Sequence, residues 1–332
     1  MRFLALGDTH LGLHRGRTSQ ARREMAERTI AQFSYCVKEA LHHRVDAVLH
    51  TGDIFDRSQP PSWVIQQYYE VIEPLLDADI GLLVIPGNHD RGYLQPSLLD
   101  YLYPDYKVFN QLGYHDIDHT RIIGLPYTRK MGRGQLQHIQ QWSQRKGSLL
   151  LAHQLFFGAW VGPQRFRFRA NNCLDIAGLP AHLQIIAGHI HRSQVVAHQH
   201  VIYTGSTVRT SFAEAIEPKG YLLGEITPHQ VTATFRELPT PSMEVIEING
   251  HTLHLENLDS ILEDISPQTP VLLRIVQCRL DTASRVRLLQ RYDPSRWPFL
   301  VVSPSSPATI LAPLYSIYQG NFQDPEINRI WS

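Results

Sequence analysis

Five short segments along the chain carry aspartate, asparagine and histidine side chains, which are the types that ligate metal ions. Each segment directly follows a short apolar run that is typical of a buried strand. Ligand sites in open α/β sheets lie just outside the carboxyl ends of the strands, so loops at one edge would bring these side chains together. Singly, each segment could be an ordinary turn, because Asn and Asp suit turns, but five in order at strand ends predict a metal site. The segments are Gly7-Asp8-Thr9-His10, Gly52-Asp53-Ile54-Phe55-Asp56, Gly87-Asn88-His89-Asp90, His153 and Gly188-His189-Ile190-His191.

The donor types indicate which ions such a site would take. Carboxylate, amide and imidazole donors without thiolates suit Mn²⁺, Fe²⁺ or Zn²⁺ rather than a soft-metal site. The chain has 18 histidines but only three cysteines, with no C-x-x-C spacing. This argues against disulfides and against a thiolate metal site.

Alternating strands and helices in the first half of the chain are expected to position these segments. Apolar residues at three- to five-residue spacing predict a helix over 20–43. Pro60-Pro61 predicts a second helix that begins there and ends near Asp77. From residue 195 the pattern changes to alternation typical of antiparallel strands. Short buried strands are expected over 3–7, 46–50, 80–85, 149–152 and 185–187.

Length and composition indicate a two-domain globular protein. The chain has 332 residues, of which 43% are hydrophobic and 19% charged. These values exclude a disordered tail, a fibrous repeat and a disulfide scaffold. Pro-Thr-Pro-Ser at 239–242 indicates a linker. We therefore expect a first domain over 1–238, a linker over 239–244 and a small α+β domain over 245–332.

Charge and hydropathy limit the partners and the location. Lys+Arg and Asp+Glu both total 31, so the net charge is zero and any nucleic-acid contact must come from local basic patches. The apolar runs fall far below the ~18 residues that span a bilayer. Asp8 interrupts the N-terminal apolar run that a secretory signal would need. We expect a cytoplasmic protein that does not bind a membrane.

The order of the five segments resembles the calcineurin-like metallophosphoesterase superfamily, whose pattern is GDxH, GDxxD, GNH[DE], a lone His and GHxH. The resemblance implies an α/β fold, a four-layer αββα sandwich with a small C-terminal α+β capping domain, and two metal ions at the strand ends. It also implies the ligands of each ion. They are Asp8, His10, Asp53 and His191 for one ion, and Asn88, His153, His189 and the shared Asp53 for the other.

This centre would hydrolyse phosphate esters. Two cations about 3.5–4 Å apart would hold a bridging hydroxide that attacks phosphorus in line. Mn²⁺ is the expected ion, and Fe²⁺ and Zn²⁺ are the alternatives. His89 resembles the family's catalytic histidine, which protonates the leaving alkoxide. Asp56 or Asp90 could orient His89 or raise its pKa. The alternative for both is loop hydrogen bonding, which we favour for Asp90.

Longer sequence motifs around these segments resemble the SbcD branch of the superfamily. SbcD is the nuclease subunit of a double-strand-break repair complex. The resemblance implies DNA as substrate, exonuclease or endonuclease action, a homodimer, and an SbcC-type coiled-coil ATPase as partner. In that branch the ATPase docks on a helical segment that follows the capping domain. We expect this docking segment to be short or missing here, because the chain stops at Ser332. Residues 310–332 would pack on the cap or form a reduced partner-binding element. The branch resemblance rests on residues 7–12, 52–57, 188–194 and 203–220.

Local basic and polar residues are candidates for DNA contact. In an extended strand, the Arg-Phe alternation over 165–169 would place its arginines on one face. The alternative for 165–169 is a half-buried strand with a solvated cationic face. For the arginines after the first motif, the alternative is ordinary solvated helix charges. For the stretch 203–220, the alternative is a structural role. The candidates are Arg15, Arg17, Arg165, Arg167, Arg169, Ser206 and Arg209.

Two other function classes remain open. One is a phosphoesterase acting on a small nucleotide or a phosphoprotein, and the other is a non-catalytic scaffold with the same fold. A scaffold would tolerate the loss of ligands, whereas every ligand position and His89 are intact here. His50, one strand position inside the second motif, is interpreted as a core histidine with satisfied hydrogen bonds.

Overall fold

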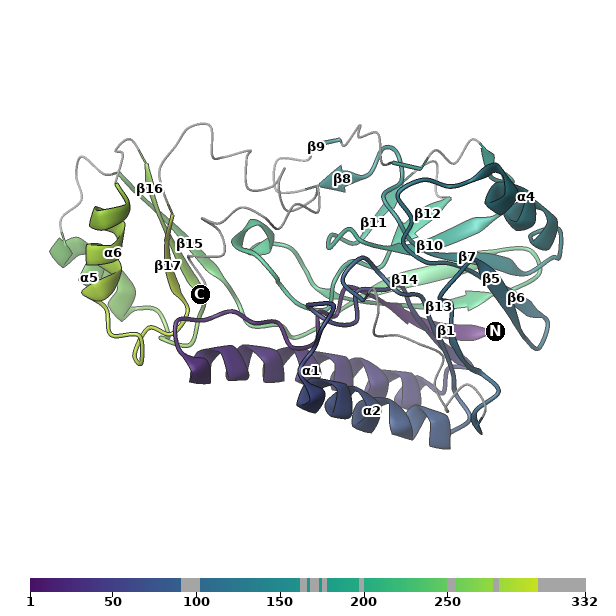
Figure 1. Cartoon of the computed structure of the whole chain (residues 1–332), viewed down its shortest axis with the longest axis horizontal. Coiled ribbons are helices and arrows are strands. Elements are labelled where there is room, and N and C mark those ends of the chain that lie inside the picture. Colours follow the sequence, from purple (N-terminus) through teal and green to yellow (C-terminus); the bar gives the residue numbers. More distant parts are fainter. Residues whose placement is uncertain are drawn as a thin grey trace. The chain divides into compact units, whose positions relative to one another are not determined.

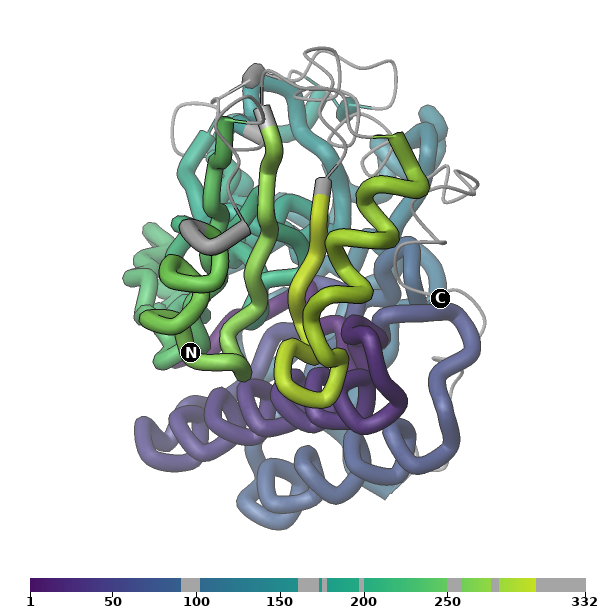
Figure 2. Tube along the Cα trace, turned by 90° about the vertical axis from the view of Figure 1, so that its left-hand side faces the viewer, coloured from purple at the N-terminus to yellow at the C-terminus, as the bar shows by residue number. Residues whose placement is uncertain are grey.

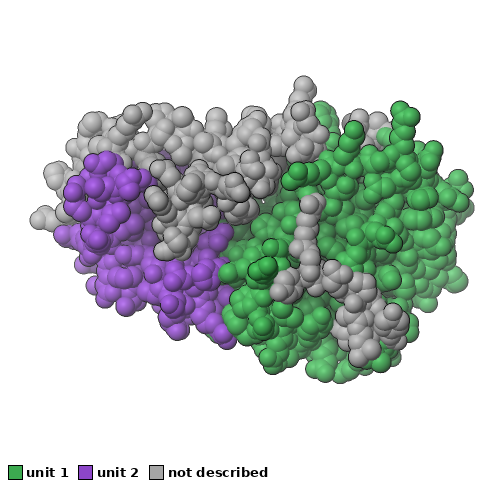
Figure 3. Space-filling model, in the orientation of Figure 1, with its two compact units in different colours: residues 1–13, 27–210, 217–240 green, residues 14–26, 211–216, 241–332 purple. Residues whose placement is uncertain are grey.

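The computed structural model divides the chain into two compact units (Figure 3). Unit 1 comprises 1–13, 27–210 and 217–240, and unit 2 comprises 14–26, 211–216 and 241–332. Unit 2 thus includes two segments from within the predicted first domain, and the predicted boundaries at 238 and 245 stay a prediction. The structure describes residues 1–90, 102–161, 166–167, 173–174, 178–196, 200–249, 255–276 and 281–303.

Unit 1 contains two six-stranded sheets. The first has the order β14-β13-β1-β2-β3-β4, and in it β1 to β4 run parallel while β13 is antiparallel to β1. The carboxyl ends of β1, β2 and β3 therefore lie at one edge. The strands are β1 (Arg2–Leu6), β2 (Ala47–His50), β3 (Gly81–Val84), β4 (Tyr106–Val108), β13 (Gly220–Ile226) and β14 (Val231–Glu237).

The second sheet has the order β11-β12-β10-β7-β6-β5, with β6, β7, β10 and β12 parallel. Its inner face packs on the first sheet through a shared core in which Phe3 and Leu49 meet Leu149 and Ile186. Strands that are covered on both faces need apolar residues at successive positions, which explains the continuous apolar runs in the sequence. The strands are β5 (Gly113–Ile117), β6 (Thr120–Leu125), β7 (Ser148–His153), β10 (Gln184–Gly188), β11 (Gln194–Val196) and β12 (Val201–Tyr203).

Helices cover the outer faces of both sheets. α1 (Ser19–His43) and α2 (Ser62–Asp77) lie side by side against the first sheet (Figure 1, Figure 2). Phe33 of α1 stacks on Tyr68 of α2 with 5.9 Å between ring centroids. α4 (Arg133–Trp142) contacts β5 on the second sheet, where the rings of Trp142 and Tyr114 meet. The predicted α/β class and the predicted helices and strands of the first half are confirmed.

Unit 2 is built around a three-stranded parallel sheet in the order β15-β16-β17. Helices alternate with the strands, and Leu258 and Trp297 pack on the sheet in a separate core. The Asp281 side chain caps the N-terminus of the helix over 282–290 by accepting a hydrogen bond from the Ser284 N–H at 2.7 Å. The elements are β15 (Glu244–Asn249), α5 (Leu255–Glu263), β16 (Val271–Val276), α6 (Thr282–Gln290) and β17 (Leu300–Ser303).

Two smaller elements complete the description. The strands β8 (Trp160–Val161) and β9 (Phe166–Arg167) pair antiparallel over two residues each, and η2 (Phe212–Glu214) is a single 3₁₀ turn. Among the helices that the structure describes, none combines the length and apolar character needed to cross a bilayer.

Candidate metal centre

The loops that follow strands of both sheets are tied together at one edge of unit 1. The Asp8 N–H donates to the Gly52 carbonyl at 2.8 Å, and the His10 N–H donates to the Asp53 carbonyl at 3.1 Å. From the second sheet, the His189 N–H donates to the Asp8 carboxylate at 3.0 Å. These bonds join the loops after β1, β2 and β10.

Several predicted ligands have a left-handed backbone conformation, which side chains with a Cβ rarely adopt. This conformation costs about 1–2 kcal/mol per residue. The hydrogen bonds between the loops hold it in place, a pattern that is characteristic of functional sites. The residues and φ angles are Asp8 (48°), His10 (44°), Asp53 (51°) and His189 (86°).

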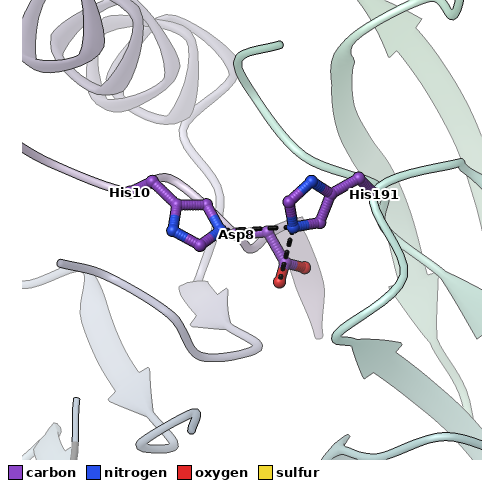
Figure 4. Close-up of side chains that lie close together, drawn as sticks. All are labelled: Asp8, His10 and His191. Carbon is purple, nitrogen blue, oxygen red and sulfur yellow. Dashed lines mark hydrogen bonds and ion pairs between the residues drawn. The ribbon is translucent and has the colours of Figure 1, made fainter. Parts of the chain in front are cut away.

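The first donor group consists of Asp8, His10 and His191, which converge from the loops after β1 and β10 (Figure 4). The Nε2 atoms of His10 and His191 are 3.2 Å apart, and His191 Nε2 is 3.7 Å from Asp8 Oδ1. Ligands at about 2.0–2.2 Å from one metal ion stand about 3–3.5 Å from each other. Two imidazole nitrogens that face each other at this distance fit a shared cation.

The second donor group consists of Asp53, His153 and His189, with Asn88 beside it. His153 Nδ1–H donates to the Thr51 carbonyl at 2.7 Å, which makes Nε2 the atom available to a metal ion once His153 is neutral. That Nε2 is 3.4 Å from Asp53 Oδ2 and 3.1 Å from Asn88 Oδ1. The ring of His153 is thus already oriented for a ligand role.

Asp53 lies between the two donor groups. Its Oδ1 accepts the His89 N–H at 2.8 Å, and its Oδ2 faces His153. Donor atoms of His10, Asp53 and His89 also lie within 4.8 Å of one another. This position fits a carboxylate that serves both sites.

Two motif glycines allow the close approach of His153. A Cβ on Gly52 would lie 2.5 Å from His153 Nδ1, and Gly52 has a φ of +100°. A Cβ on Gly188 would lie 2.5 Å from the Thr51 carbonyl oxygen that holds His153. Any side chain at either position would displace the ring.

Burial and mutual charge determine protonation in the centre without metal. Burial lowers the pKa of His189 to about 3, and the charge of His153 adds to this effect. Burial also disfavours the His153 imidazolium, but Asp53, Asp8 and the Thr51 carbonyl together outweigh burial and raise the pKa of His153 to about 9. Burial raises the pKa of Asp8 to about 6. The site thus keeps an internal cation at neutral pH, which a divalent metal ion would replace.

Comparison with known proteins decides the family. The family model named calcineurin-like phosphoesterase matches residues 1–193. The chain belongs to this family.

Curated relatives of this phosphoesterase are DNA repair proteins. The DNA double-strand break repair protein Mre11 of Haloferax volcanii is 28% identical over 255 residues, 75% of this chain and 54% of that protein. Mre11 of Halobacterium salinarum is 28% identical over 233 residues, 66% of this chain and 55% of that protein. The chain therefore spans about half the length of the curated relatives it matches. Among solved structures, a dimetal phosphatase from Danio rerio has a TM-score of 0.49 and 13% identity, over 71% of this chain and 96% of that one.

His89 of the phosphoesterase is oriented by Asp56 through the main chain. His89 Nδ1–H donates to the Asp56 main-chain carbonyl at 2.7 Å. The Asp56 carboxylate instead lies 4.0 Å from His10 Nδ1. Asp56 thus orients His89 through its main-chain oxygen, and a catalytic role for the Asp56 carboxylate stays a prediction.

The Asp90 carboxylate has the loop role favoured from the sequence. Its oxygens accept the N–H groups of Ile54 at 3.0 Å, Phe55 at 2.9 Å and Gly87 at 3.0 Å. These bonds join the loop after β3 to the loop after β2, and so place Asn88 and His89 beside Asp53.

His50 is a buried histidine with satisfied hydrogen bonds, as expected. Its Nδ1 accepts the Gly52 N–H at 3.2 Å, so the proton lies on Nε2, which donates to Thr9 Oγ1 at 3.2 Å. The Thr9 hydroxyl donates to the Ile54 carbonyl at 3.0 Å. This chain of bonds connects the loop after β1 to the loop after β2.

Tyr127 is a residue of this edge that the sequence analysis missed. Its ring centroid lies 5.5 Å from that of His189 and 6.1 Å from that of His153. Tyr127 follows β6, which is parallel to β7, so its loop emerges at the same edge as His153. Tyr127 lies two residues after the end of β6, and this position could have indicated a residue at the same edge as the ligand loops.

The structure gives several DNA-contact candidates an internal role instead. Arg17 donates to the carbonyls of Leu289, Tyr292 and Trp297 within unit 2. Ser206 is fully buried, and its hydroxyl donates to the Val208 carbonyl at 2.7 Å.

Arg209 also bonds within its own unit. It donates to Thr240 Oγ1 at 2.6 Å and to the Glu217 carbonyl at 3.0 Å. These contacts use polar groups of Arg17, Ser206 and Arg209 within the protein, which favours the structural alternative, and their contact with DNA stays a prediction.

The remaining candidates stay predictions. The half-exposed Arg15 donates to the His14 carbonyl at 3.2 Å. Arg167 lies in β9, where its backbone pairs with Trp160. Arg165 and Arg169 lie outside the described residues, as does the segment 310–332.

Proposed function

We propose that this phosphoesterase is a two-metal phosphodiesterase that hydrolyses DNA, with an exonuclease or endonuclease role in processing the ends of double-strand breaks. The observation that carries the proposal is the pair of donor groups joined by Asp53, with His89 beside them. Similarity to Mre11 proteins supports DNA as the substrate.

The proposed ligands follow from the two donor groups. Asp8, His10 and His191 would hold one ion, and His153 and His189 with Asn88 the other, with Asp53 shared. The donors suit Mn²⁺ first, with Fe²⁺ or Zn²⁺ as alternatives. Such ions supply a Lewis acid that activates water and offsets the phosphoryl charge.

His89 would act as the general acid. Because the Asp56 carbonyl accepts its Nδ1–H, the Nε2 atom is directed toward Asp53, 4.0 Å from Oδ2. A proton on Nε2 would pass to the leaving alkoxide, a step that typically contributes about 10²–10⁴-fold in rate. The family resemblance adds a homodimer and an SbcC-type ATPase as proposed partners.

The test is hydrolysis in Mn²⁺ of end-labelled duplex DNA, bis-p-nitrophenyl phosphate and p-nitrophenyl phosphate. We expect cleavage of DNA and of the diester, and loss of both in His89→Ala with Mn²⁺ still bound. His229→Ala is the matched control. Its exposed turn follows β13, whose end pairs with the start of β1 and so lies opposite the ligand loops.

Other outcomes would favour the competing functions. Hydrolysis of the monoester or of nucleotides alone would favour a small-molecule or phosphoprotein phosphatase. A protein that binds no Mn²⁺ and cleaves none of the three substrates would favour a non-catalytic scaffold. Full activity in His89→Ala would overturn the general-acid role.

A further inference from the structure

The stretch that follows β12 encloses the back of His191. The His191 carbonyl accepts the Ser206 N–H at 3.1 Å and the Lys219 ammonium at 3.1 Å. The other end of the residue is held as well, because His191 Nδ1–H donates to Thr210 Oγ1 at 3.2 Å. This directs His191 Nε2 toward Asp8 and leaves it available as a ligand atom.

Lys219 is an unusual residue to find in this position. Its side chain is 0% exposed, and its ammonium forms an ion pair with Glu217 Oε2 at 3.3 Å. A buried ion pair generally adds little net stability, because removing both charges from water offsets their attraction. The energetic reason for a lysine here is therefore weak, and its contact with a ligand residue points to a role in the centre.

The surrounding contacts keep the lysine in place. The Glu217 carbonyl accepts from Arg209, which also donates to Thr240 Oγ1. The Lys219 carbonyl accepts the Leu238 N–H at 2.7 Å. The ammonium is thus attached to a fixed part of unit 1.

Gly205 allows this approach. It has a φ of +72°, and a Cβ there would lie 3.2 Å from the His191 carbonyl oxygen and 2.7 Å from the Ser193 nitrogen. A side chain at this position would crowd the carbonyl that Ser206 and Lys219 contact.

We propose that Lys219 is a positioning residue for the first donor group, acting through the His191 carbonyl, with Thr210 orienting the ring of the same histidine. The inference rests on the proposed two-metal function. It predicts a selective effect. In the second donor group, His153 depends on other contacts, because Thr51 and Asn88 hold it.

The experiment measures Mn²⁺ affinity rather than activity. Metal-free wild type is titrated with Mn²⁺ by calorimetry and by electron paramagnetic resonance, and two classes of site are expected. His10→Ala and His153→Ala assign the classes to the first and second donor groups. Lys219→Met should weaken the first class by about 10–100-fold, the usual effect of losing an outer partner of a ligand. The second class should change by less than about threefold.

Two further variants separate positioning from folding. Lys219→Met combined with Glu217→Gln removes the unpaired buried carboxylate that the single variant would leave. Thr210→Val removes the hydroxyl that contacts the His191 ring and keeps the Lys219–Glu217 ion pair. Both should reproduce the selective loss, with a thermal unfolding midpoint measured for each.

The other outcomes overturn the inference in distinguishable ways. Equal weakening of both classes, in step with the unfolding midpoint, would mean that Lys219 is only structural. Unchanged affinities in Lys219→Met and Thr210→Val would do the same. If the wild type bound no Mn²⁺, both the proposed function and this inference would fail.

Discussion

His89 and Asp56 are joined by a hydrogen bond from an imidazole N–H to a main-chain carbonyl, with 2.7 Å between Nδ1 and the oxygen. A substitution of the Asp56 side chain keeps this bond. We therefore expect Asp56→Asn to lower kcat by less than about tenfold at saturating Mn²⁺. His89→Ala should lower it by about 10²–10⁴-fold.

The measurement is the rate of bis-p-nitrophenyl phosphate hydrolysis by both variants over a range of Mn²⁺ concentrations. Because the Asp56 carboxylate lies 4.0 Å from His10 Nδ1, its loss should appear mainly as a higher Mn²⁺ requirement. Equal kcat losses in the two variants would show that the carboxylate itself assists His89.

Mn²⁺ binding should release protons. His153 must be neutral to bind a metal ion, yet its pKa is raised to about 9 in the metal-free centre, so at pH 7 it carries a proton. Asp8 must be ionised, and its pKa is raised to about 6. Release should therefore be about one proton at pH 7.5 and approach about two near pH 5.5, and Mn²⁺ affinity should fall as the pH falls.

Calorimetry in buffers of different ionisation enthalpy gives the number of protons released. His153→Ala is the control, and it should release about one proton fewer. Binding enthalpies that do not depend on the buffer would contradict the prediction.

His50 should make the metal-free protein sensitive to acid. Burial lowers its pKa to about 3, against about 6.5 in an unfolded chain. Its contribution to stability is present above pH 6.5 and is lost as the pH falls toward 3. Between those values the free energy of unfolding should decrease by about 1.4 kcal/mol per pH unit from this group alone.

Urea unfolding at several pH values in a chelator tests this dependence. The slope between pH 6 and pH 4 should be smaller by about 1.4 kcal/mol per pH unit in His50→Gln than in the wild type. Parallel curves for the two proteins would mean that His50 is not the group that titrates.

Arg17 should contribute to folding and not to DNA binding. Its guanidinium donates to three carbonyls in unit 2, and hydrogen bonds from a charged group contribute about 1.5–3 kcal/mol each before exposure is considered. Because the residue is only half-buried, we expect Arg17→Ala to lower the free energy of unfolding by about 1–3 kcal/mol. Arg17→Lys should lower the free energy of unfolding by nearly as much as Arg17→Ala, because an ammonium cannot reproduce the planar arrangement of guanidinium donors.

Arg15→Ala is the matched comparison, since Arg15 remains a candidate for phosphate contact. Its loss should reduce the slope of log affinity against log salt by about one, with little effect on unfolding. DNA affinity by fluorescence anisotropy at several salt concentrations distinguishes the two residues. A reduced salt slope in Arg17→Ala would overturn its assignment as structural.

Local patterns in the sequence determined much of the fold. The helix predicted over 20–43 is α1, and the strands predicted over 3–7, 46–50 and 80–85 are β1, β2 and β3. Apolar periodicity and proline position were sufficient here because these elements lie against one continuous core. The same reasoning placed the polar segments at strand ends, and the structure gathers their side chains at one edge.

Only the tertiary structure decided which atoms meet. Whether Asp56 reaches His89 by its carboxylate or by its carbonyl depends on the loop conformation, which residue types do not specify. The internal hydrogen bonds of Arg17, Ser206 and Arg209 could not be predicted, because their partners are backbone carbonyls and distant side chains that no local pattern reveals. Lys219 became visible as a partner of His191 only when residues 28 positions apart were brought together in the fold.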